Sequence, residues 1–247
     1  MEGVTISGDW DLCCGEMYFR QGLFNVTERV AEKLTAYYRG RDIGTMLFAC
    51  PAGLNMFRNV LPGQFGAEFD FDTAYIGTWL LDRLESGELE IKKRLNRSVA
   101  MHDSCHGRIL GGEIMDTSRR LLTMMGLEVV EMEHNREDGY CCGLAAGCNR
   151  YNPADMFSAS VKELKETSGT GADELALYCT ACQITLTTMR WLHPTAQPVR
   201  HLLEYLKEAA GEEVDHPAQG RSFHLLANTI RNAFPKIASR KTYRLQI

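Results

Sequence analysis

Apolar positions along the chain follow two alternating patterns, and each pattern predicts a different kind of element. Short apolar runs, which are typical of buried strands, occur within 45–57, 97–108, 127–133 and 175–186. Apolar residues at helical spacing, which are typical of amphipathic helices, occur within 75–89, 112–126, 152–167 and 199–211. Because strand-like and helix-like segments alternate, the pattern predicts an α/β fold built from parallel βαβ units.

The cysteines add a second regularity, which is a repeat. The triplet Cys-Cys-Gly occurs at 13–15 and again at 141–143, 128 positions later. A further cysteine follows each triplet after 35 and 36 residues, at Cys50 and Cys179. Self-similarity at a fixed spacing indicates a duplicated unit. The sequence therefore predicts two Rossmann-like βαβ repeats related by a pseudo-two-fold axis.

This duplication divides the chain into three expected parts. They are a truncated, degenerate first repeat over 1–96, a second repeat with an intact cysteine motif over 97–211, and a basic C-terminal extension over 212–247. From His216 onward the extension has six Lys or Arg and no acidic residue. Its apolar residues, spaced as on one face of a helix, are Phe223, Leu225, Leu226, Ile230 and Phe234. We expect this basic helical tail to dock on the protein itself or on a partner subunit, and not on nucleic acid, since no other basic cluster supports that.

Length and composition exclude several classes of protein. The 247 residues are 45% hydrophobic and 24% charged, which is typical of a soluble globular chain. The sequence has no apolar run near the length that spans a bilayer, and its start lacks a secretory signal, so we expect a cytoplasmic protein. Nine cysteines, an odd number, in such a chain favour metal or redox chemistry over a disulfide framework.

Five of the six cysteines within 97–211 make up the motif of the second repeat, namely Cys105, Cys141, Cys142, Cys179 and Cys182. Cys105 and Cys179 follow expected strands, where sites assemble at the carboxyl edge of a parallel sheet. A helix that starts at the Cys-x-x-Cys segment 179–182 favours thiolate over thiol. Gly143 permits a tight loop, which can turn the sulfurs of both preceding cysteines toward one bound group. Five thiolates exceed the four of a structural zinc site and suit an iron–sulfur cluster, although zinc, a redox pair at 179–182 and the absence of metal stay open as alternatives.

Polar residues around Cys105 allow two interpretations. His102, Asp103 and His106 could deliver protons or donate hydrogen bonds to cluster sulfurs, or they could satisfy the backbone of a loop. Arg108 is a candidate to offset the negative charge of a thiolate cluster. Cys148 lies outside the repeated motif, and we expect it to be a small buried residue.

The order of one cysteine, 35 residues, Cys-Cys-Gly, 36 residues and Cys-x-x-Cys resembles the cysteine-rich CCG domain found in the B-type and D-type subunits of heterodisulfide reductase. The resemblance covers about residues 1–210. In that family each such motif holds a non-cubane [4Fe-4S] cluster, so the resemblance implies the following ligands: Cys105, Cys141, Cys142, Cys179 and Cys182. It further implies an oxidoreductase subunit that transfers electrons and reduces a disulfide. Some relatives hold zinc at equivalent positions, so a zinc-binding structural or docking subunit of an oxidoreductase complex is the alternative.

The first repeat departs from the family pattern. It keeps Cys13, Cys14 and Cys50, but Gly53 stands where the last cysteine of the motif is expected. We therefore expect this repeat to be empty or to hold a different group. The chain also lacks the C-x2-C-x2-C-x3-C-P run of bacterial ferredoxins, so we expect electrons to come from a ferredoxin-type iron–sulfur subunit or a flavoprotein subunit in a hetero-oligomer.

Overall fold

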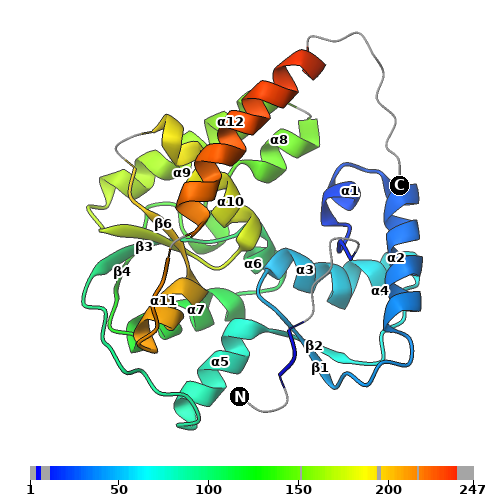
Figure 1. Cartoon of the computed structure of the whole chain (residues 1–247), viewed down its shortest axis with the longest axis horizontal. Helices are drawn as coiled ribbons and strands as arrows, with labels where there is room; N and C mark the ends of the chain where they lie inside the picture. The colour runs from blue at the N-terminus through cyan, green and yellow to red at the C-terminus, as the bar shows by residue number, and fades with distance from the viewer. Residues whose placement is uncertain (1–3, 7–11, 151, 194–195, 216, 238–247) are drawn as a thin grey trace.

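The computed structural model describes residues 4–6, 12–150, 152–193, 196–215 and 217–237. Its strands pair in parallel in two sheets, one of order β1-β2 and one of order β4-β3-β5-β6 (Figure 1). The strands are β1 (Thr45–Phe48), β2 (Asp72–Tyr75), β3 (Ser98–His102), β4 (Glu128–Val130), β5 (Glu174–Leu177) and β6 (Val199–His201). The expected α/β fold with parallel strands is therefore confirmed.

Helices connect these strands along the whole chain. Those of the first part are α1 (Glu16–Arg20), α2 (Phe24–Tyr38), α3 (Pro51–Asn55), the π-helical turn η1 (Met56–Val60), α4 (Leu61–Phe65) and α5 (Ile76–Glu85). Those that follow are α6 (Cys105–Ile109), α7 (Glu113–Met124), η2 (Arg136–Asp138), α8 (Leu144–Arg150), α9 (Pro153–Gly169), α10 (Thr180–Met189), η3 (Arg190–Leu192), α11 (Leu202–Ala209) and α12 (Pro217–Ile237). The helices expected within 75–89, 112–126 and 152–167 are confirmed, whereas 199–211 begins as strand β6 before it becomes α11.

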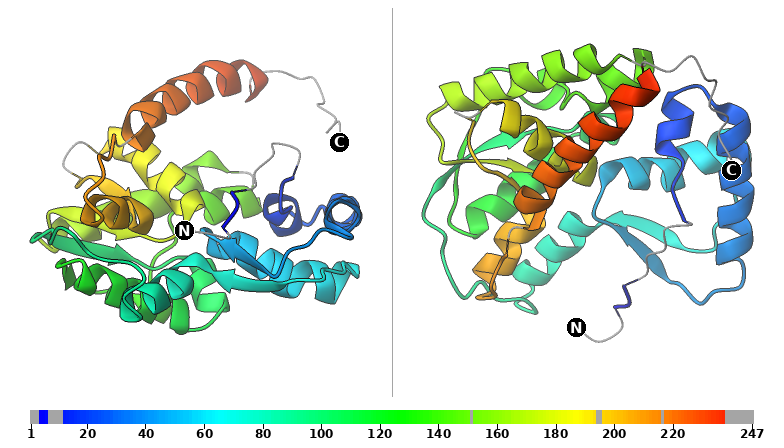
Figure 2. Two further views of the ribbon diagram at one scale, coloured as in Figure 1. Left: turned by 60° about the horizontal axis from the view of Figure 1, so that its bottom comes forward. Right: turned by 45° about the horizontal axis from the view of Figure 1, so that its top comes forward.

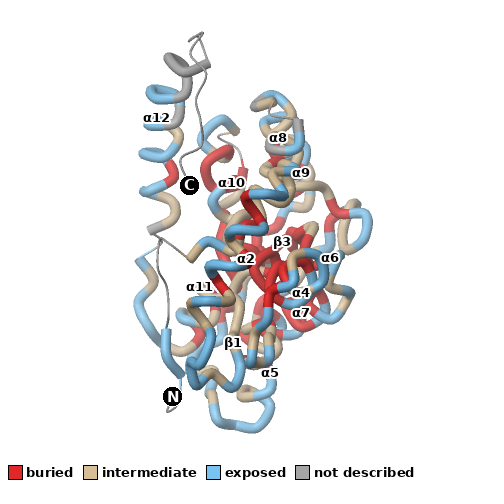
Figure 3. Tube along the Cα trace, turned by 90° about the vertical axis from the view of Figure 1, so that its right-hand side faces the viewer, coloured by how far each residue is buried: buried red, intermediate tan, exposed pale blue. Residues whose placement is uncertain are grey.

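Helices cover both faces of the four-stranded sheet, because successive side chains of a strand point to opposite faces. Val99 and Met101 of β3 belong to a core that includes residues of α7 and α11, whereas Ala100 belongs to a core that includes residues of α9 and α10. In the left-hand view of Figure 2 the green helix α7 lies below the sheet and the yellow helix α10 lies above it. Buried residues concentrate around β3, α7 and α10 (Figure 3).

The first part of the chain has a smaller core of its own. Leu34 of α2 packs there with Met56 and Phe57 of η1 and with Leu61 of α4. Aromatic rings extend this core, since the ring centroids of Phe57 and Phe69 lie 4.8 Å apart. Leu54 of α3 and Tyr75 of β2 belong instead to the core of the larger sheet, and they hold the smaller sheet beside it (Figure 1).

The C-terminal extension forms the long helix α12, which lies across α10 (Figures 1 and 2). Trp191 fixes its start, because Nε1 donates a hydrogen bond to Ser222 Oγ at 2.9 Å and the ring lies 5.2 Å from that of Phe223. Leu225 and Ile230 remain about half exposed. The side chain of Phe234 and residues 238–247 lie outside the described part. No helix among the described residues is both long and apolar enough to cross a membrane.

The register of the central strands sets the position of the site. His102, the last residue of β3, pairs with Leu177, the last residue of β5. The segments that leave these strands, 103–105 and 178–179, therefore start side by side at the carboxyl edge of the sheet. Cys105 and Cys179 are brought to one place by this register, as the strand-end argument predicts.

Candidate metal centre

Both Cys-Cys-Gly triplets form the same tight loop ahead of a helix. Gly15 has φ +80°, and its backbone N–H donates to Cys13 Sγ at 3.4 Å. Gly143 has φ +103°, and its backbone N–H donates to Cys141 Sγ at 3.3 Å. Only glycine adopts such positive φ angles readily, so the third letter of each triplet is required by the backbone. α1 follows the first loop and α8 follows the second.

Cys50 and Cys179 also occupy matching positions. Each directly precedes a helix in extended conformation, with φ −119° and ψ 120° at Cys50 and φ −122° and ψ 123° at Cys179. The backbone N–H groups of Gly53 and Cys182 donate to the respective sulfurs. A helix N-terminus stabilises negative charge, so both positions favour thiolate.

The structure brings the Cys-Cys-Gly loop and the Cys-x-x-Cys segment of the second part together. The sulfurs of Cys142 and Cys182 lie within 4.8 Å of each other, and Cys179 interacts electrostatically with both. All three side chains are buried in the core that includes residues of α9 and α10. Cys141 precedes Cys142 and is half-buried. Cys105, the first residue of α6, lies close enough to interact electrostatically with Cys142 and Cys179. All five are free thiols.

A sixth cysteine joins this group from the first part of the chain. Cys50 Sγ lies 3.7 Å from Cys179 Sγ. Cys14 in turn interacts electrostatically with Cys50, while Cys13 is exposed. The spacing of the cysteines assigned Cys50 to a separate, degenerate repeat and gave no sign of this contact. Both Cys50 and Cys179 follow a strand and precede a helix, and that shared signal becomes informative only once the two sheets are known to lie side by side.

Neighbouring thiols set the charge of the central sulfurs. Hydrogen bonds from Cys141 and Cys182 hold the pKa of the Cys142 thiol well below its ordinary value, despite burial. Hydrogen bonds from Cys182 and Cys50 lower the pKa of Cys179 in the same way. Metal ions bind the thiolate form of cysteine. The pKa of Cys182, which neighbours both, is raised by the same contacts. A metal bound here would displace protons from the thiols, since it binds cysteine as thiolate.

His102 faces the same sulfurs from the end of β3. Its Nδ1 lies 2.7 Å from Glu163 Oε1, and both side chains are only 1% exposed. A ring nitrogen of His102 and the sulfurs of Cys142 and Cys182 all lie within 4.8 Å of one another. Burial alone would lower the pKa of His102, but the Glu163 carboxylate and the Cys142 sulfur raise it above its ordinary value. A buried imidazole among thiols, with no hydrogen-bond partner at Nε2, fits a site for a metal.

Asp103 serves the fold and not the sulfurs. Its carboxylate accepts two hydrogen bonds from Arg119, at 2.9 and 2.7 Å, and one from the backbone N–H of Arg136 at 2.7 Å. The hydroxyl of Tyr178 donates to it at 3.2 Å. Of the two interpretations open for this residue, the satisfaction of loop backbone is the one that its contacts favour. Asp103 ties the segment after β3 to the turn that leads into the second Cys-Cys-Gly loop.

The first part of the chain supplies the positive charge beside the cysteines. Arg20, at the end of α1, places Nη2 4.0 Å from Cys105 Sγ and 2.7 Å from His106 Nε2. Glu16, one turn earlier, places Oε1 3.0 Å from the same His106 nitrogen. Arg20 also interacts electrostatically with Cys141. The sequence alone does not reveal this residue as part of the site.

Arg108, the candidate for that charge, has another role. Its Nη1 donates to the backbone carbonyls of Glu137 at 2.8 Å and Gly139 at 2.9 Å. It therefore positions the loop ahead of Tyr140 and Cys141. The side chain of Cys148, on α8, lies outside the described part of the structure.

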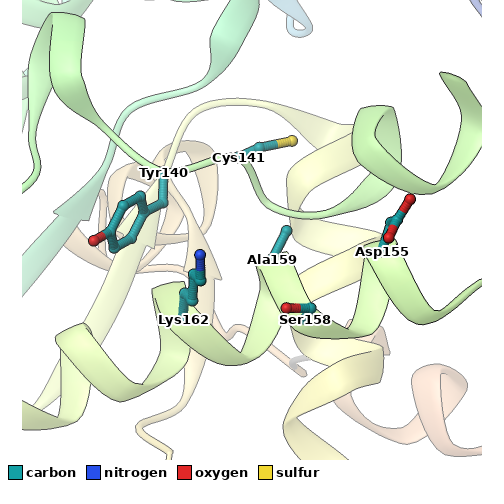
Figure 4. Close-up of a pocket in the computed structure, with 6 residues that line it drawn as sticks. All are labelled: Tyr140, Cys141, Asp155, Ser158, Ala159 and Lys162. Atoms are coloured by element: carbon teal, nitrogen blue, oxygen red, sulfur yellow. The ribbon is translucent and has the colours of Figure 1, made fainter. Parts of the chain in front are cut away.

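A cavity of about 280 Å³ opens beside Cys141. It lies between the Cys-Cys-Gly loop and α9 (Figure 4) and is lined by Tyr140, Cys141, Asp155, Ser158, Ala159 and Lys162. In the close-up the ammonium group of Lys162 rises from α9 toward the loop that carries Tyr140 and Cys141. This cavity gives solvent a route to the less buried sulfur of the second loop.

Known proteins share sequence similarity with the part of the chain that forms this site. The family model of the CCG cysteine-rich domain matches residues 99–187. The D subunit of the dihydromethanophenazine:CoB–CoM heterodisulfide reductase of Methanosarcina mazei is 27% identical over 218 residues, which cover 85% of this chain and 53% of that protein. A probable iron–sulfur-binding oxidoreductase of Bacillus subtilis is 30% identical over 145 residues, covering 58% of this chain and 20% of that protein. The B subunit of the fumarate reductase (CoM/CoB) of Methanothermobacter marburgensis is 27% identical over 176 residues, covering 71% and 34%.

The chain spans about half the length of the heterodisulfide reductase subunits that it matches. The segment matched by the family model contains every cysteine of the second motif and His102. Its strands, its cysteine spacing and the convergence of its sulfurs all agree with that match. Residues 99–187 therefore match the CCG cysteine-rich domain, and D-type subunits of heterodisulfide reductase are among the proteins to which the chain is similar.

Proposed function

We propose that this protein is an iron–sulfur subunit of a heterodisulfide-reductase-like oxidoreductase, with one non-cubane [4Fe-4S] cluster in its second repeat. The proposed ligands are Cys105, Cys141, Cys142, Cys179 and Cys182. The observation that carries the proposal is that Cys142, Cys179 and Cys182 are buried together as free thiols, with the partly buried Cys105 and Cys141 close enough to interact with them. A structural zinc site uses four ligands, whereas a cluster of several irons offers positions for more thiolates.

The architecture supports a duplicated organisation for this function. We propose that 1–96 and 97–211 are repeats and that 212–247 is a basic extension. Support comes from the two Cys-Cys-Gly loops, whose glycines both have positive φ, and from the matching backbone angles at Cys50 and Cys179. In the first repeat Gly53 replaces a cysteine, so the full set of ligands exists only in the second.

A bound cluster would supply single-electron transfer at a low-dielectric site. The surrounding residues exclude water from Cys142, Cys179 and Cys182, which are buried. Arg20 offsets part of the negative charge of the thiolates at Cys105 and Cys141. The cavity at Cys141 offers a substrate a path to the site from the side of α9.

The proposed reaction is the reduction of a disulfide. Two electrons and two protons convert one disulfide into two thiols, and the electrons arrive one at a time. The names of two groups of relatives, a CoB–CoM heterodisulfide reductase subunit and a CoM/CoB fumarate reductase subunit, support a thiol–disulfide couple as the substrate class. These relatives are named as subunits, and this chain lacks a ferredoxin-type cysteine run, so we propose a ferredoxin-type iron–sulfur subunit or a flavoprotein subunit as the electron partner.

A second candidate is a zinc-binding structural or docking subunit of such a complex. One observation favours it: His102, Cys142 and Cys182 lie within 4.8 Å of one another, and imidazole and thiolates are the usual ligands of zinc. Under this alternative the protein carries no redox centre of its own.

Metal analysis after anaerobic purification separates the two candidates. The iron–sulfur proposal expects brown protein with about four iron and about four acid-labile sulfide per chain. Cys142→Ala should lose this metal, because Cys142 is the most central of the sulfurs, whereas Cys13→Ala, at the exposed first position of the other triplet, should keep it. Colourless wild-type protein with about one zinc would establish the alternative instead. Equal loss in both variants would contradict the assignment of the cluster to the second repeat.

A further inference from the structure

We propose that His102 is a ligand of the metal centre through Nε2, and that Glu163 holds its ring in the ligating orientation. This inference rests on the metal centre of the proposed function, but it concerns a residue that the cysteine motif does not contain. It holds for iron or for zinc, because imidazole nitrogen binds both.

Burial is the first step of the argument. His102 ends β3 in the middle of the sheet, and its side chain is 1% exposed, as is that of Glu163. Nε2 has no hydrogen-bond partner among the described residues. Buried polar atoms of native proteins are almost always paired, so an orphaned nitrogen indicates a missing partner.

The tautomer is the second step. Glu163 Oε1 lies 2.7 Å from Nδ1, and a carboxylate accepts hydrogen bonds. Nδ1 therefore carries a hydrogen, which leaves Nε2 as the ring nitrogen available to a metal. A carboxylate behind the distant nitrogen is the usual support of a metal-bound histidine, since it fixes the ring and raises the basicity of the ligand.

The position of the ring beside two thiols is the third step. His102, Cys142 and Cys182 each offer a ligand atom within 4.8 Å of the other two, and Nε2 is the ring nitrogen that Glu163 leaves available. The two thiols come from different elements, the Cys-Cys-Gly loop and helix α10. One nitrogen and two sulfurs that converge in this way form one face of a coordination shell.

The other described histidines near the site are arranged differently. His134 has the same kind of carboxylate partner, Glu166 at 3.0 Å, but its Nε2 lies 3.2 Å from the hydroxyl of Tyr140. His106 places Nε2 beside Glu16 and Arg20 of α1. His201 is buried, but its Nδ1 accepts a hydrogen bond from the backbone of Leu203, so its Nε2 carries the hydrogen and has no lone pair to offer.

Histidine-specific ¹⁵N labelling of the intact wild-type protein tests the inference without any variant. Metal analysis first identifies the metal. If it is iron, pulsed electron paramagnetic resonance of the reduced protein should show a ¹⁵N hyperfine coupling of the size seen for a directly bound imidazole. If it is zinc, X-ray absorption should show one nitrogen scatterer at about 2.0–2.1 Å beside the sulfurs.

Two variants assign that signal to a residue. The nitrogen signal should be absent from His102→Ala and present in His134→Ala, which removes the matched histidine–glutamate pair. Glu163→Gln should keep the metal but change the nitrogen signal, because the amide supports the ring less firmly. If His102→Ala does not fold, the labelled wild type still decides.

The possible failures are distinguishable. Wild-type protein that holds its metal through sulfur alone would overturn the role of His102 and leave the proposed function standing. A nitrogen signal that survives in His102→Ala would do the same. Wild-type protein without metal would overturn the proposed function and this inference together.

Discussion

Removal of Arg119 should destabilise the protein strongly, because it would leave the carboxylate of Asp103 buried without a counter-charge. The Asp103 side chain is 0% exposed, and Arg119 contacts its two oxygens at 2.9 and 2.7 Å. The contacts that would remain come from the backbone N–H of Arg136 and the hydroxyl of Tyr178, and neither group is charged.

The size of the effect follows from the cost of a lone buried charge. Burial opposes ionisation, but Arg119 more than compensates and holds the pKa of Asp103 below its ordinary value, so the carboxylate is charged at neutral pH. Breaking a buried ion pair by removal of one partner costs about 3–5 kcal/mol, whereas replacement of both partners is often nearly neutral. We therefore expect Arg119→Met to lower the free energy of unfolding by about 3–5 kcal/mol. Adding Asp103→Asn should restore more than half of that loss.

Urea unfolding of the wild type, both single variants and the double variant at neutral pH measures this coupling. Arg120→Met is the matched control: it lies next to Arg119 on α7, but its side chain is 62% exposed and its partner Glu85 is also near solvent. An exposed pair contributes about 0–1 kcal/mol, so the control should change little. The reasoning is refuted if Arg119→Met costs no more than Arg120→Met, or if the two single costs simply add in the double variant.

Gly143→Ala should disrupt the second Cys-Cys-Gly loop and its metal, because φ is +103° and a Cβ would clash with the carbonyl oxygen of Met156. Gly22→Ala is the control for the strain of a positive φ without a clash, since φ is +73° and no atom lies within 4 Å of a Cβ there. Equal metal content in the two purified variants would contradict the steric argument. Glu208→Gln should weaken the dependence of the free energy of unfolding on pH in the acid range, because the hydrogen bond from Arg97 lowers the pKa of Glu208 to about 2 from 4.5. A depressed carboxylate stabilises the fold above its unfolded pKa and loses that contribution as the pH falls from about 4.5 toward 2. Unfolding free energies measured from pH 6 to pH 3 should therefore fall less steeply in the variant, and identical slopes would rule out this source of pH dependence.

Local patterns in the sequence were sufficient for the fold class, for four of the six described strands and for several of the longer helices. The apolar runs that became β3, β4 and β5 and the helical spacing that became α7 and α9 report burial on one side of an element, which is a property of neighbouring residues. β2 and α2 were not predicted, and β6 was missed because Val199–His201 runs directly into α11 with no turn residue between them, so that 199–211 has one helical pattern. Strand ends, and with them the positions of Cys105 and Cys179, followed from the same local signals.

Contacts between segments that are distant in the sequence could not be predicted from such local patterns. Nothing in the spacing of Arg20 shows that α1 packs beside α6, and nothing near Glu163 shows that its carboxylate meets His102. These contacts depend on the packing of one sheet against the other and of α9 against β3. The cysteine spacing predicted a set of five sulfurs, but it did not predict that Cys50 would lie against one of them, Cys179.

The contact of α1 and β1 with the later cysteines has a practical consequence for anyone who trims this protein. A shortened version that starts near residue 97 would retain the whole segment matched by the family model. It would nevertheless lose Glu16 and Arg20, which cover His106 and Cys105, and Cys50, which lies against Cys179. Air and chelators would then reach sulfurs that the longer chain shelters. The unit to express, crystallise or graft is therefore larger than the matched domain, because Glu16, Arg20 and Cys50 shelter side chains of the segment that follows.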